Sequence, residues 1–156
     1  MSARLITAIV ATALSGAALA ADVSYTKDVA PIIKNYCSEC HGADSPDLDT
    51  WKANEKKYVQ EKTGPRMHTY NELISYIGWP DTGAFMRRLD DGKGTADGKP
   101  GNMYRQLGSD EAERQKNLAI LKDWVGEGAW NLNRWAVRGN VPAITKEQLD
   151  KLKLKY

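Results

Sequence analysis

The sequence has little of what defines several common protein classes. Its 156 residues contain two cysteines, too few to build a disulfide scaffold for a chain of this length. Charge of one sign is not in excess, because 22 lysines and arginines stand against 20 aspartates and glutamates. Nucleic-acid partners usually demand a concentrated basic face, so this balance argues against them. The length supports one globular domain and leaves little room for two.

Long apolar runs are absent after residue 20, and the run before it is typical of an export signal. Arg4 supplies a short positive start, residues 5–20 carry no charge, and residues 18–20 (Ala-Leu-Ala) suit a signal peptidase. An uncleaved membrane anchor is the alternative, but the run is shorter than the roughly 20 residues of a membrane span. We therefore expect residues 1–20 to be removed. Residues 21–156 would then form a soluble protein with no stable membrane insertion, located in the periplasm of a bacterium.

Strand signals are also missing, since no segment shows convincing period-two alternation. Apolar residues recur at helical spacing instead, which predicts an all-α fold. The first helix is expected to be capped by Thr26 or Asp28, and a glycine-rich loop is expected between Asp90 and Gly101. Helices are predicted over about 27–36, within 51–62, from a Thr69 cap to about 77, over 84–89, from a Ser109 cap to about 125, and from a Thr145 cap to about 152.

Both cysteines and one of the two histidines lie in a single pentapeptide, Cys37-Ser38-Glu39-Cys40-His41. Cys-x-x-Cys-His is the attachment site of a c-type haem. Two thiols one helical turn apart can add to the two vinyl groups on one edge of the porphyrin, and the adjacent imidazole can bind the iron. The motif therefore predicts one covalent haem c attached to Cys37 and Cys40, with His41 as a metal ligand.

Other interpretations of the pentapeptide are weaker. A thioredoxin-like redox pair would require a βαβ setting, which the sequence lacks. A zinc site would require four ligands, and Cys37, Cys40, His41 and His68 are the whole supply, with two of them adjacent in sequence. A disulfide between Cys37 and Cys40 would close only a tiny loop and contribute little stability.

The second axial ligand of the haem has four candidates once Met1 is lost with the signal, namely Met67, Met86, Met103 and His68. Ligation by His and Met is an electron-transfer arrangement, and the thioether raises the reduction potential relative to a second imidazole. Met86 lies in a helical pattern and is expected in the core, whereas Met67 and His68 fit an exposed loop. Met103 follows the glycine-rich loop, which can bring its sulfur to the open face of the iron. We predict Met103, with Met86 and His68 as the main alternatives.

The sequence resembles monohaem class I c-type cytochromes over about residues 25–130, leaving a C-terminal extension at 131–156. The resemblance lies in Tyr25-Thr26-Lys27-Asp28-Val29-Ala30-Pro31-Ile32-Ile33 before the pentapeptide and Gly42, in Leu48-Asp49-Thr50, in Met103, and in Leu121-x-x-Trp124-Val125-x-x-Gly128-Ala129.

This resemblance implies a class I cytochrome c fold with helices around one haem, and His/Met ligation in which Met103 is the matching position. It also implies that a proline carbonyl holds the Nδ1 proton of His41, for which Pro65 and Pro46 are both available. The chain departs from the family pattern at Tyr104, where proline is common.

The leading functional interpretation is a soluble periplasmic electron carrier that shuttles single electrons between redox-partner proteins. It is not expected to be an enzyme, because six-coordinate iron has no vacant position for a substrate. One alternative is a haem sensor or peroxidase-like protein with a displaceable sixth ligand. Another is the cytochrome subunit of a larger oxidoreductase complex.

Overall fold

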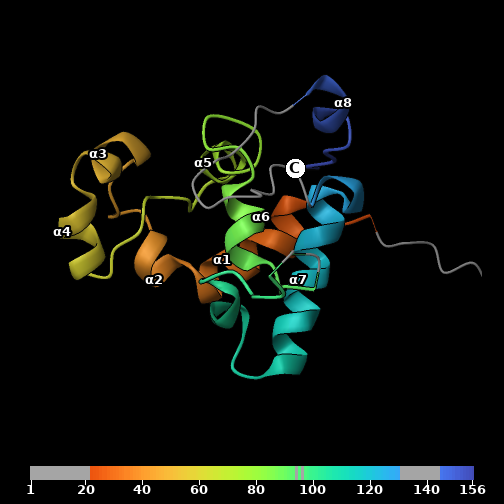
Figure 1. Ribbon diagram of the computed structural model, residues 1–156, viewed down its shortest axis with the longest axis horizontal. Coiled ribbons are helices and arrows are strands. Elements are labelled where there is room, and N and C mark those ends of the chain that lie inside the picture. The colour runs from red at the N-terminus through yellow and green to blue at the C-terminus, as the bar shows by residue number, and fades with distance from the viewer. Residues whose placement is uncertain (1–21, 94, 96, 131–144) are drawn as a thin grey trace, which may run out of the picture.

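The computed structural model describes residues 22–93, 95, 97–130 and 145–156 (Figure 1). The proposed signal at 1–20 and Trp135 of the extension lie outside these residues. All regular structure in the described residues is helical, which confirms the predicted all-α class. The elements are η1 (Tyr25–Val29), α1 (Ala30–Tyr36), α2 (Ser38–His41), α3 (Leu48–Ala53), α4 (Glu55–Gln60), α5 (Tyr70–Ser75), α6 (Ala84–Leu89), η2 (Tyr104–Leu107), α7 (Glu111–Val125), η3 (Glu127–Ala129) and α8 (Lys146–Leu149).

The hydrophobic core forms where the first helical segment crosses the longest helix. Element η1 packs against α7, and the predicted apolar stripe of α7 is fully buried at Leu121, Trp124 and Val125. Val29 of η1 is likewise 0% exposed, and α5 contributes the buried Leu73. Each such side chain contributes about 1.5–3 kcal/mol by leaving water, so this crossing stabilises the fold. No helix in the described part of the chain is long and apolar enough to cross a bilayer.

The start of the first helix differs from the prediction. Ser24 is the cap, because its hydroxyl accepts the Lys27 N–H, while the Asp28 carboxylate accepts the Ser24 N–H at 2.9 Å. Thr26 therefore is not the cap, and Asp28 is the reciprocal partner of a cap further upstream. Pro31 does lie in the opening turn of α1, where a missing N–H costs nothing.

The caps of later helices follow the sequence pattern more closely. Thr69 and Glu72 form the predicted capping box at the start of α5, and Thr145 forms another with Gln148 ahead of α8. At α7 the cap is Asp110, whose carboxylate accepts a backbone N–H at 2.8 Å, and not Ser109. Either side chain can cap a helix, so composition could not separate two adjacent candidates.

A single short helix was predicted within residues 51–62, but the structure has two. Helices α3 and α4 are six residues each, they meet at Asn54, and neither contains a buried residue. Figure 1 shows them together on the side of the molecule away from α7. The indole Nε1 of Trp51 donates to the Thr63 carbonyl at 2.8 Å, which ties this pair to the segment that follows α4.

The C-terminal residues pack onto the core crossing. The Lys155 carbonyl accepts two hydrogen bonds of 2.8 Å, from the Tyr25 N–H of η1 and from the indole of Trp124 in α7. The Leu154 carbonyl accepts the Tyr70 hydroxyl at 2.7 Å, and the Tyr156 ring stacks on Tyr25. The end of the chain therefore holds η1, α5 and α7 together.

Deletion of residues 153–156 is expected to lower the melting temperature by roughly 10 °C, since several hydrogen bonds of about 1 kcal/mol each are lost. Lys155→Ala is the matched control, because it keeps the carbonyl and removes only an exposed ion pair with Asp22. Thermal unfolding followed by circular dichroism measures both. A deletion variant that melts like the wild-type protein would show that this packing does not stabilise the fold.

Candidate functional site

The pentapeptide that contains both cysteines is one turn of helix. The chain bends at Cys37 between α1 and α2, and the Cys37 carbonyl accepts the His41 N–H at 2.9 Å. At 100° per residue, positions 37, 40 and 41 fall on one face of this turn. Cys37 and Cys40 are half-buried and free. The two thiols and the imidazole therefore share one side of this turn.

The environment of the thiols argues against the alternative chemistries. Burial, with a smaller effect of the neighbouring Cys40, raises the pKa of the Cys37 thiol to about 11. A thioredoxin-type pair needs the opposite, a thiol whose pKa is lowered toward neutrality. Within the described residues, no group of three or more His, Cys, Asp and Glu side chains is arranged to hold a metal ion. The redox-pair and zinc interpretations are therefore disfavoured.

The His41 ring is held by a backbone carbonyl. Its Nδ1 lies 2.7 Å from the Pro65 oxygen. A carbonyl can only accept, so the ring proton is on Nδ1 and the Nε2 lone pair is free. Burial lowers the pKa of His41, the nearby Arg88 guanidinium lowers it further, and the hydrogen bond to Pro65 partly opposes both. The imidazole is therefore neutral near pH 7. Of the two prolines that the sequence left open, the structure selects Pro65.

The segment around Pro65, residues 63–67, runs along the pentapeptide as a strap. The Gly64 N–H donates to the Cys40 carbonyl at 2.7 Å, and the Met67 N–H donates to the His41 carbonyl at 3.1 Å. The approach is so close that a Cβ on Gly64 would lie 1.9 Å from Cε1 of His41. Only glycine fits at this position, because any side chain would overlap the ring.

Met103 stands immediately before η2, at the end of the glycine-rich loop. It is half-buried against the core, and its N–H donates to the Arg88 carbonyl at 2.9 Å. Arg88 is also the residue whose charge acts on His41. The backbone of Arg88, the last but one residue of α6, therefore fixes the backbone of Met103.

The other candidate ligands have different environments. Met86 is 0% exposed within the core, as expected of a packing residue. The Nδ1 of His68 is 2.9 Å from the Glu72 carboxylate, so this ring is engaged elsewhere. Met67 belongs to the strap that holds the His41 ring, and its N–H donates to the His41 carbonyl.

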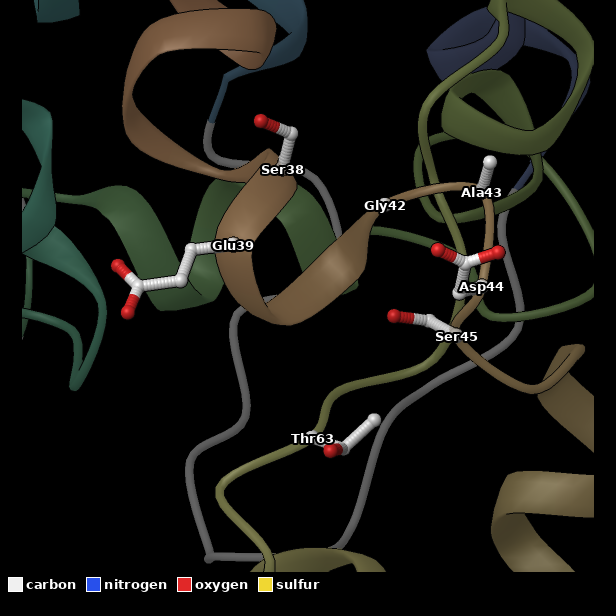
Figure 2. Close-up of a pocket in the computed structure, with 7 residues that line it drawn as sticks. All are labelled: Ser38, Glu39, Gly42, Ala43, Asp44, Ser45 and Thr63. Atoms are coloured by element: carbon white, nitrogen blue, oxygen red, sulfur yellow. The ribbon is translucent and has the colours of Figure 1, made fainter.

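A polar hollow of about 310 Å³ beside α2 is a separate feature. Figure 2 shows it between the outer turn of α2 and Thr63. Its walls include Ser38 and Glu39, the two residues between the cysteines of the pentapeptide. Neither cysteine nor His41 lines it, and a hydrophobic porphyrin would not favour so polar a surface. The hollow is therefore not the site that the motif predicts.

Two residues of the site were not identified from the sequence. The sequence indicates only that Gly64 belongs to a Gly-Pro turn. Its contact with His41 depends on how the strap folds back. For Arg88, the sequence indicates only a basic residue near the end of a helix. No signal in the sequence relates either residue to a pentapeptide that is more than 20 positions away.

Comparison with known proteins identifies the family. A family model described as PccH cytochrome c matches residues 24–156, which include the C-terminal extension. The structure of the monohaem cytochrome PccH from Geobacter sulfurreducens is 52% identical in sequence, covers 86% of this chain and 98% of that chain, and superposes with a TM-score of 0.74. No protein with a curated description matches. The chain belongs to the PccH cytochrome c family and is a monohaem c-type cytochrome with the all-α class I fold.

Proposed function

We propose that this cytochrome is a periplasmic carrier that shuttles single electrons between redox-partner proteins. Membership of the family makes it a haem-based electron carrier with one covalent haem c. The proposal goes further by assigning Cys37 and Cys40 as the attachment residues, and His41 and Met103 as the axial ligands. The main observation that supports this proposal is the neutral His41 ring, which Pro65 holds at Nδ1 beside two free thiols.

The residues on this helical turn fit a haem c. Two free thiols three residues apart suit the two vinyl groups, and the free Nε2 of the neighbouring ring suits iron. When bound, the haem supplies an iron that exchanges one electron between its ferric and ferrous states. The chain's own part is to hold His41 rigidly, since a ligand that keeps its position in both states limits reorganisation.

Met103 is the sixth ligand that the surroundings favour. It is only partly buried, whereas Met86 is enclosed in the core and His68 is already engaged by Glu72. A thioether stabilises ferrous iron preferentially, which raises the reduction potential. A coordinated sulfur would also close the iron to small ligands, as a carrier requires and a sensor does not.

The cellular location is part of the proposal. Residues 1–20 carry the charge, the apolar run and the small-residue site of a cleavable export signal. Covalent haem c in an exported bacterial protein would place the carrier in the periplasm, where its partners are other redox proteins.

Covalent attachment predicts a mass for the mature protein equal to the polypeptide from Ala21 plus one haem. Mass spectrometry of the denatured protein measures this, and the haem is expected to stay with the polypeptide in acidified organic solvent. Replacing either Cys37 or Cys40 with Ala should leave the haem attached through one thioether only. Haem that extracts from the wild-type protein would rule out the assignment of both thiols.

Met103→Ala is expected to abolish the sulfur-to-ferric-iron charge-transfer band, to allow carbon monoxide binding and to lower the reduction potential. Spectra and redox titrations near pH 7 measure these effects. Met86→Ala is the control. It should keep the charge-transfer band, the resistance to carbon monoxide and the wild-type reduction potential, while the protein loses about 2–5 kcal/mol of stability.

If Met86→Ala abolished the charge-transfer band and allowed carbon monoxide binding while Met103→Ala did neither, Met86 would be the ligand. Rapid carbon monoxide binding by the wild-type protein would favour a sensor over a carrier.

Gly64→Ala is expected to disturb the His41 ring, because the added carbon overlaps it and must displace the strap. The cost is about 1–3 kcal/mol. A weaker Nδ1–H bond to Pro65 makes the imidazole a poorer electron donor, so the reduction potential should rise. Gly78→Ala is the control, since its Cβ meets nothing closer than 3.9 Å. Equal potentials in the two variants would show that the strap does not position His41.

A further inference from the structure

The loop that precedes Met103 closes at a neck beside the end of α6. It leaves this helix at Asp90 and returns at Gly101, whose N–H donates to the Asp90 carbonyl at 2.8 Å. The two sides of the neck are so close that a Cβ on Gly101 would lie 2.2 Å from the Arg88 oxygen. Met103 follows two residues later. Contacts that hold Asp90 and Gly101 together at the neck therefore also restrict the backbone of Met103.

A buried carboxylate stands at this neck. Asp90 is 1% exposed, although it belongs to a loop rich in exposed residues. Its Oδ1 accepts the Gly92 N–H at 2.7 Å, and its Oδ2 accepts the Trp130 indole N–H at 2.6 Å. Hydrogen bonds to a charged acceptor contribute about 1.5–3 kcal/mol, and burial strengthens them.

The donor of the second bond comes from a distant part of the chain. Trp130 follows η3, 40 residues after Asp90, and is only 3% exposed. Its ring packs edge-on against Phe85 of α6 at 6.4 Å, and the Lys122 ammonium of α7 lies 5.6 Å above it. Trp130 is thus fixed by two helices and offers the loop a rigid donor.

We propose that Asp90 and Trp130 form a latch that positions Met103 at the iron, with Asp90 and Trp130 acting as positioning residues. The proposal rests on the assignment of Met103 as the sixth ligand. The indole N–H holds the carboxylate, the carboxylate and carbonyl of Asp90 hold the neck, and the neck sets the place of Met103. Loss of the latch raises the fraction of molecules in which the sulfur has left the iron.

That fraction can be measured with an external ligand. Imidazole binds ferric iron only when the sulfur has left, so its apparent dissociation constant equals the intrinsic constant divided by the open fraction. A variant with a tenfold larger open fraction binds imidazole tenfold more tightly. It also keeps the charge-transfer band without imidazole as long as the open form stays a minority.

Two variants of the full-length holoprotein test the latch. Trp130→Phe keeps an aromatic ring against Phe85 and removes the indole donor. Asp90→Asn keeps the shape of the side chain and replaces one acceptor oxygen with an NH2 group, which cannot accept the N–H of Gly92 or Trp130. Each is expected to bind imidazole about tenfold more tightly than the wild-type protein in a spectroscopic titration at pH 7.

Trp124→Phe is the matched control. Trp124 is also fully buried, and it also donates its indole N–H to one oxygen, the Lys155 carbonyl. This variant should lose thermal stability while its affinity for imidazole stays that of the wild-type protein. If Trp124→Phe tightened imidazole binding as much as Trp130→Phe, the effect would come from general loosening and the latch would be refuted.

The remaining outcomes separate the latch from the ligand assignment. Unchanged imidazole affinity in both latch variants, with a normal charge-transfer band in the wild-type protein, refutes the latch and leaves Met103 as the ligand. A wild-type protein that lacks the band and binds imidazole no differently from Met103→Ala refutes the ligand assignment, and the latch with it.

Discussion

The hydrogen bond from His41 Nδ1 to the Pro65 carbonyl is the contact on which the rest of the site depends. It sets the tautomer, and so leaves Nε2 available to a metal. It exists because the strap at 63–67 returns along the pentapeptide, bonded to the Cys40 and His41 carbonyls, and because Gly64 has no side chain to keep the strap away. A peptide with the same pentapeptide but no strap would have both thiols and the ring, with nothing to orient the ring.

Much of the fold and the centre of the site could be predicted from the sequence, because both are encoded locally. The capping box of Thr69 with Glu72 lies within four residues, and so does the spacing of the pentapeptide. The helical class follows from the same short-range patterns. The errors were also local, where two adjacent residues had the same capping chemistry, as at Ser109 and Asp110. In such cases the tertiary setting decides which hydroxyl or carboxylate faces the free N–H groups.

What could not be predicted is long-range. The choice of Pro65 over Pro46 depends on how the strap folds back, and the partnership of Asp90 with Trp130 spans 40 residues and three helices. The sequence places Asp90 only at the start of the glycine-rich loop, whereas the structure buries it almost completely. A buried carboxylate is costly unless it is hydrogen-bonded, so burial identifies it as a residue with a specific task in a way that composition does not.

Short helices explain why these long-range contacts matter so much here. Apart from α7, the α-helices of the described chain have seven residues or fewer, well below the length at which a helix is stable alone. Their positions are therefore set by tertiary contacts, and the candidate ligands are attached through non-helical backbone. The Pro65 carbonyl holds the ring of His41, and the Arg88 carbonyl holds the backbone of Met103. The Pro65 carbonyl does not titrate, so the orientation of the His41 ring does not depend on the protonation of a side-chain partner, whereas the place of Met103 also depends on the side chain of Asp90.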